Sequence, residues 1–114
     1  LYQNLYLMEN SLFVTGFGAF SGVEDNPSKH IVLELKNSGF CCGNFQQIHF
    51  SILEVSVEHC SQIHAKFAET GGQNSVFVHI GVDSKAKSIK LEQCAYNNMT
   101  FRVPDVCGYQ PQDL

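Results

Sequence analysis

The stretch Ser11-Leu12-Phe13-Val14-Thr15-Gly16-Phe17, with Asn26-Pro27 after it, decides the fold. The stretch is short, apolar and rich in β-branched residues, which predicts a buried strand. Asn26 predicts a helix cap, because its side chain can accept hydrogen bonds from free backbone N–H groups. Pro27 suits the first helical position, where a missing N–H leaves nothing unpaired. A strand that leads through a loop into a helix is typical of the start of a βαβ unit.

The alternation of strand and helix continues along the chain. Further elements are expected as a helix from Pro27 that ends at Gly39, a strand over 46–55, a helix over 57–69 and a strand over 75–81. The last of these is apolar nearly throughout, which favours a central strand covered on both faces. Residues 87–103 are expected to be extended or irregular. The element order predicts the α/β class, with a three-layer α/β/α arrangement around a mostly parallel twisted sheet.

Composition excludes several classes of protein. The 114 residues, 44% hydrophobic and 16% charged, fit one ordered domain, expected over residues 11–114 after a poorly ordered segment 1–10. The net charge of −4, with scattered basic residues, speaks against nucleic-acid and membrane partners. The first ten residues lack the features of a signal peptide, which favours the cytoplasm. Both ends look like cuts within a longer chain.

The five cysteines are expected to be free thiols in that compartment. They are Cys41, Cys42, Cys60, Cys94 and Cys107. No C-x-x-C pair occurs among them, so a structural zinc site or a thioredoxin-type redox motif has little support. No metal and no cofactor are expected.

Three groups of residues could carry chemistry. The glycine-containing loop 16–22 fits nucleotide binding poorly, because the helix opens only near Asn26. Phe17 and Phe20 lie in that loop, where two rings could wall a small apolar pocket or fold back onto the core. Glu92 has apolar neighbours in sequence, where a carboxylate could orient a histidine or pair with Arg102 or a lysine.

The histidines leave two alternatives open. Cys60 and His64 lie one helical turn apart, which suits a Cys–His pair or simply the core face of a helix. His79 falls inside the last expected strand and is interpreted as a core histidine with its hydrogen bonds satisfied.

Two signatures in register resemble those of the pyroglutamyl peptidase I family of cytosolic cysteine peptidases. The first, V-T-G-F-x-P-F-x-G followed by N-P, corresponds to residues 14–22 and Asn26-Pro27. The second comprises H-x-G, [IL]-E-[RK], A-x-N and R-[IV]-P-D. It corresponds to His79-Ile80-Gly81, Leu91-Glu92-Gln93, Ala95-Tyr96-Asn97 and Arg102-Val103-Pro104-Asp105. The resemblance implies the N-terminal part of this α/β fold.

The resemblance also implies a function, removal of N-terminal pyroglutamate from peptides by a Cys-His-Glu triad. Glu92 corresponds to the triad glutamate that orients the histidine. The implied substrate-binding residues are Phe17 and Phe20 on the lactam ring, the backbone near Gly16 and Val82, Asn26, and Arg102 near the site. A homo-oligomer of the full-length protein is left open.

Departures from the family pattern limit what this stretch could do alone. Ala19, Ser21 and Gln93 are mild replacements. The nucleophile segment A-G-x-[YF]-x-C-N and the histidine segment F-[IV]-H-[IV]-P do not occur, and the resemblance assigns both to a part beyond Leu114. The 114 residues alone are therefore expected to be inactive. The alternative is a short product without catalysis that binds a ligand or a partner protein.

Overall fold

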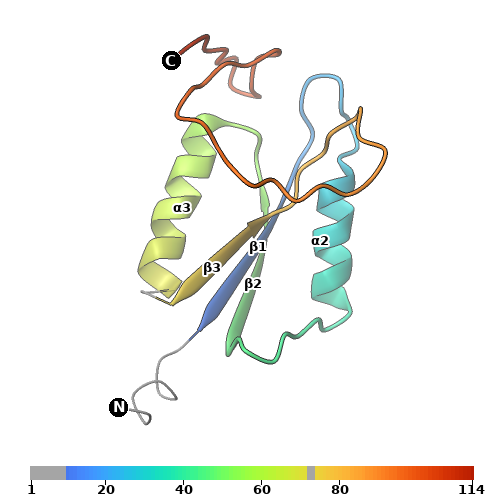
Figure 1. Ribbon diagram of the computed structural model, residues 1–114, viewed down its shortest axis with the longest axis vertical. Helices are drawn as coiled ribbons and strands as arrows, with labels where there is room; N and C mark the ends of the chain where they lie inside the picture. The colour runs from blue at the N-terminus through green and yellow to red at the C-terminus, as the bar shows by residue number, and fades with distance from the viewer. Residues whose placement is uncertain (1–9, 72–73) are drawn as a thin grey trace.

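The computed structural model describes residues 10–71 and 74–114 (Figure 1). Apart from Asn10, the expected N-terminal segment 1–10 lies outside the described residues. The elements are β1 (Ser11–Phe17), α2 (Pro27–Asn37), β2 (Gln47–Leu53), α3 (Val57–Gly71) and β3 (Ser75–His79). All five expected elements are confirmed, with ends that shift by up to two residues. Among the described residues, no helix has both the length and the apolar character that a membrane crossing requires.

The three strands form one parallel sheet with the order β2-β1-β3. β1 is therefore the central strand, and its residues Ser11 to Gly16 are all buried. The expectation that β3 would be covered on both faces is wrong. Val76, Phe77 and Val78 are 47%, 39% and 43% exposed, because among the described residues β3 pairs with β1 alone. The apolar run over 75–81 thus predicted a strand correctly, but it did not predict the position of that strand in the sheet.

The two helices cover opposite faces of the sheet, which confirms the three-layer α/β/α arrangement (Figure 1). Val32 of α2 packs in one cluster with Leu12 and Val14 of β1. Phe13, which points to the other face, contacts Phe67 of α3 with ring centroids 4.4 Å apart. Alternate residues of a strand point to opposite faces, so β1 alone supplies the core on both sides.

Residues 80–114 contain neither helix nor strand and pass across the end of the sheet where the strands finish (Figure 1). Asp105 fixes this segment to the connection between β2 and α3. Its carboxylate accepts hydrogen bonds from the backbone N–H of Val57 at 3.1 Å and of Cys107 and Tyr109 at 2.9 Å each. The Val106 N–H also donates to the Val55 carbonyl at 3.0 Å. The irregular segment is thereby held against the N-terminus of α3.

Candidate functional site

A cavity of about 320 Å³ lies at the carboxyl end of the sheet, where parallel α/β proteins bind their ligands. Its walls come from the end of β1, the start of α3 and the irregular C-terminal segment. They consist of Phe17, Val55, Ser56, Val57, Cys60, Ser61, His64, Met99, Phe101 and Asp105. Most of this lining is apolar, which suits a small ligand with an apolar body and a few polar atoms.

Among the predicted substrate-binding residues, Phe17 is the one that lines this cavity. It is half-buried at the last position of β1, and its backbone N–H donates to the Ser28 hydroxyl at 2.9 Å. Phe17 therefore forms part of a cavity wall, and its expected contact with a substrate stays a prediction. Phe20 lies elsewhere, since its backbone forms a small bridge with Val23 and its side chain is outside the cavity lining.

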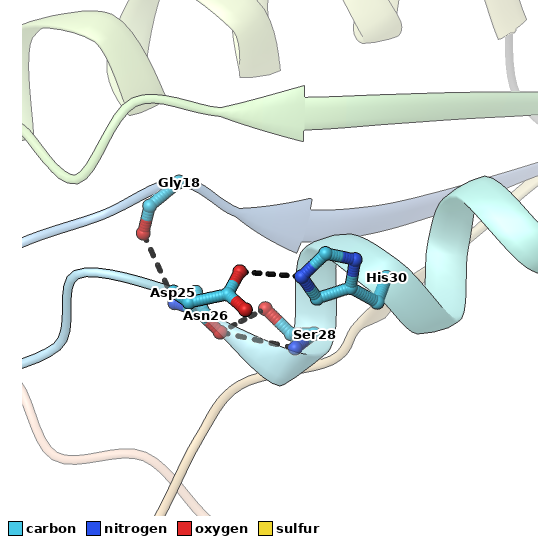
Figure 2. Close-up of polar contacts among 5 residues, drawn as sticks. All are labelled: Gly18, Asp25, Asn26, Ser28 and His30. Atoms are coloured by element: carbon cyan, nitrogen blue, oxygen red, sulfur yellow. Dashed lines mark hydrogen bonds and ion pairs between the residues drawn. The ribbon is translucent and has the colours of Figure 1, made fainter.

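Asn26 holds the loop and α2 together (Figure 2). Its side-chain amide donates to the Gly18 carbonyl at 3.0 Å. Its Oδ1 accepts from the Ser28 N–H at 3.0 Å and from the Ser28 hydroxyl at 2.8 Å. Nearby on the surface, His30 contacts the Asp25 carboxylate. Asn26 is 2% exposed, so in this structure it acts as the predicted helix cap and positions the loop.

Gly16 lies where β1 and α2 approach closely. A Cβ atom at this position would lie 2.5 Å from the Ser28 carbonyl oxygen and 3.0 Å from a Val32 methyl group. Only glycine fits such a contact without movement of the helix. The expected role of the Gly16 backbone toward a substrate stays a prediction.

The remaining predicted residues are not brought together. Glu92 lies in the irregular segment and is exposed, and among the described residues no hydrogen bond or ion pair engages its carboxylate. Within residues 10–71 and 74–114, Glu92 therefore forms no ion pair with Arg102 or a lysine, so that alternative is wrong for this part of the chain. Arg102 is exposed, and its carbonyl accepts from Gln110 at 3.2 Å. Val82 is half-buried, three residues after β3.

Cys60 and His64 both line the cavity, but no hydrogen bond joins them. Burial raises the pKa of the Cys60 thiol; a hydrogen bond at Ser56 lowers it in part, and the Asp105 and Glu54 carboxylates raise it further. The thiol instead donates to the Glu54 carbonyl at 3.6 Å. A raised pKa keeps sulfur in the neutral, poorly nucleophilic form, so this pair does not form an activated nucleophile.

Sequence reasoning missed Asp105 as the anchor of the cavity wall. The burial of this carboxyl raises its pKa, but hydrogen bonds from the backbone N–H of Tyr109, Val57 and Cys107 lower it more, so the net pKa lies below its usual value. An aspartate three residues before Gly108 is a turn signal that could have indicated part of this role. The contact with Val57 joins distant segments and has no local signal.

Comparisons with known proteins agree on one family. The family model described as Pyroglutamyl peptidase matches residues 10–114. A pyrrolidone-carboxylate peptidase from Thermococcus litoralis is 28% identical over 102 residues, which is 90% of this chain and 44% of that protein.

Solved structures give the same result. The crystal structure of a pyrrolidone carboxyl peptidase from Fervidobacterium islandicum has a TM-score of 0.79 and 28% identity, over 93% of this chain and 49% of that one. The enzyme of the same name from Pyrococcus furiosus has a TM-score of 0.77 and 26% identity, over 91% and 48%. The chain therefore spans about half the length of the relatives it matches.

Proposed function

Because the chain belongs to the pyroglutamyl peptidase family, we propose that it contributes the substrate-binding edge and the triad glutamate of a cysteine peptidase that removes N-terminal pyroglutamate. The observation that carries the proposal is the position of Phe17 in the wall of an apolar cavity at the carboxyl end of β1. A pyroglutamyl lactam is a small flat ring with apolar faces and a polar amide. Such a ligand suits an aromatic wall with backbone groups beside it.

The proposed reaction is acyl transfer to a thiolate. A cysteine sulfur bonds to the pyroglutamyl carbonyl carbon, the peptide C–N bond breaks, and a histidine gives its proton to the leaving amine. Water then hydrolyses the thioester and regenerates the thiol. The family resemblance assigns that cysteine and histidine to segments that this sequence does not contain. The 114 residues would supply binding and orientation, and we expect them to be inactive alone.

Glu92 would orient the histidine in the complete protein. Its carboxylate is exposed and, among the described residues, free of partners, which supports a contact with a histidine from another segment. A carboxylate on one ring nitrogen fixes the tautomer and stabilises the imidazolium that forms during attack. Phe20, the Gly16 and Val82 backbone, and Arg102 are proposed neighbours of the substrate, and Asn26 is proposed to position the loop.

The test uses the natural protein at its full length, established by intact mass and by the transcript past Leu114. Hydrolysis of a pyroglutamyl arylamide is measured for Glu92→Gln, with Glu69→Gln on α3 as the matched control. We expect Glu92→Gln to lower kcat by about 10²- to 10⁴-fold with little change in KM. Glu69→Gln should retain the wild-type values. Retention of wild-type kcat by Glu92→Gln would remove Glu92 from the triad.

The pocket is tested by Phe17→Ala, with the exposed Phe40 changed to alanine as control. Loss of one aromatic contact should lower kcat/KM by about 10- to 100-fold. An equal effect of both changes would show that Phe17 contributes nothing specific to the substrate.

A second candidate function is a binding module without catalysis, which the Phe17 cavity also supports. A natural chain that stops at Leu114, shows no turnover and binds a pyroglutamyl peptide in calorimetry would favour this function. Binding that survives Phe17→Ala would argue against the cavity as its site.

A further inference from the structure

Two histidines from different elements face each other beside the cavity. The Nε2 atoms of His64 on α3 and His79 on β3 lie 3.1 Å apart. The ring planes are nearly perpendicular, at 79°, and the ring centroids are 4.9 Å apart. The rings of Phe77 and Phe67 lie edge-on to the His64 ring, with centroids 6.3 Å and 6.2 Å from it, and these contacts restrict the orientation of the His64 ring.

The two rings are not aligned in a straight line through their facing nitrogens. A straight hydrogen bond between the same two nitrogens would hold the centroids about 5.4 Å apart, farther than the observed 4.9 Å. Two imidazole ligands of one metal ion lie about 2.8–3.4 Å apart, and the observed separation falls in this range.

A third residue forms a hydrogen bond with the other nitrogen of the His79 ring. The Thr15 hydroxyl lies 2.6 Å from Nδ1 of His79. When Nδ1–H donates to this oxygen, Nε2 of His79 keeps a free lone pair at 3.1 Å from Nε2 of His64. Metal-binding histidines in proteins regularly have such an outer hydrogen bond on the second nitrogen, because it sets the tautomer and the ring orientation. Thr15 is 0% exposed in the central strand, so this partner is rigid.

We propose that His64 and His79 form a two-histidine site for a divalent transition metal of the kind that prefers imidazole, such as Ni²⁺, Cu²⁺ or Zn²⁺. No group of three candidate ligand residues gathers within residues 10–71 and 74–114. The ion would therefore keep open positions for water or an external ligand. His64 also lines the cavity, so these positions lie beside it. The spacing of the cysteines does not predict this site, because its two ligands are histidines that lie 15 residues apart, one on α3 and one on β3.

Ni²⁺ is the probe for the test, because it prefers imidazole and competes less for neutral thiols than Zn²⁺. Titration calorimetry of the natural full-length protein, kept reduced, should show one Ni²⁺ bound at this site, with line broadening of the His64 and His79 ring nitrogens in ¹⁵N NMR. We expect His64→Gln to weaken binding at least 10-fold and Thr15→Val, which retains both ligands, to weaken it about 10- to 100-fold. His59→Gln, also on α3, is the matched control and should bind as wild type.

Three outcomes would overturn the proposal. They are unchanged Ni²⁺ affinity in His64→Gln, equal loss in His59→Gln, and loss of binding in Cys60→Ser, which would make the thiol the ligand. Thermal melting separates binding from folding, since Ni²⁺ should raise the Tm of wild type and not that of folded His64→Gln.

Discussion

Replacement of Gly16 by alanine should lower the free energy of unfolding by about 2 kcal/mol, because no space exists for a Cβ atom between β1 and α2. The new atom would lie 2.5 Å from the Ser28 carbonyl oxygen and 2.9 Å from its carbon. Both are backbone atoms in the first turn of α2, so no side-chain rotation relieves the contact. Either the helix or the central strand must move by several tenths of an ångström.

The magnitude follows from what that movement breaks. Overpacking of a core contact costs about 1–3 kcal/mol. The Phe17 N–H to Ser28 Oγ hydrogen bond, 2.9 Å long, crosses the same contact, and its loss adds about 0.5–1.5 kcal/mol. Alanine also lowers the conformational entropy of the unfolded chain, and this stabilisation offsets about 0.4–1 kcal/mol of the loss.

Gly18→Ala is the matched control, because the nearest atom to its Cβ would be the Leu53 carbonyl oxygen at 3.7 Å, an ordinary contact. Both changes restrict the unfolded chain equally, so their difference isolates the clash. In urea denaturation, Gly16→Ala should shift the midpoint down by about 1 M, and Gly18→Ala should stay near wild type or above it. Equal midpoints for the two variants would refute the close-contact argument.

Three further changes test other parts of the structure. Asp105 has a pKa below its usual value in the folded state, so its contribution to stability is present above about pH 4 and is lost as the pH falls through the folded pKa. Asp105→Asn should therefore flatten the fall of the urea midpoint below about pH 4, and an unchanged slope would contradict this. The buried Nε2 of His49 has no hydrogen-bond partner among the described residues, while the ring stacks on Phe13 at 4.6 Å. His49→Phe should keep the stacking and raise stability by about 1 kcal/mol, seen as a Tm increase of about 4–8 °C; a lower Tm would argue against it. Asn26→Ala should lower the free energy of unfolding, measured by urea denaturation, by about 1–2 kcal/mol. The stability of Asn26→Asp should lie between those of the wild type and Asn26→Ala, since it keeps the acceptor for Ser28 but loses the donor to Gly18. Equal stability of all three proteins would show that the cap is dispensable.

Local chemistry explains why most of the fold could be predicted. The cap at Asn26 and the proline after it define the start of α2 through contacts within a few residues. The position of β3 could not be predicted in the same way, because an apolar run reports burial in general and not which strand lies between the others. The exposed Val76, Phe77 and Val78 are the physical sign of that error.

The same difference between local signals and contacts of distant segments applies to the candidate site. Phe17 and Phe20 stood out as rings in a glycine-containing stretch, but the sequence left open whether they would wall a pocket or fold back onto the core. The separation of Phe20 and Glu92 from the cavity, the anchor at Asp105 and the pair formed by His64 and His79 all depend on contacts between distant segments. No spacing in the sequence reports such contacts.

The central place of β1 has a consequence for synthesis on the ribosome. Ser11 pairs with Gln47 on one side and with Ser75 on the other, so both strands that pair with β1 are synthesised after it. At typical translation rates, β3 follows β1 by roughly 3–13 s. During that time the apolar segment Leu12-Phe13-Val14, which forms the core on both faces, has at most one neighbouring strand. The nascent chain therefore presents this apolar segment before both of its partner strands exist, where chaperones that bind emerging apolar segments would act on it.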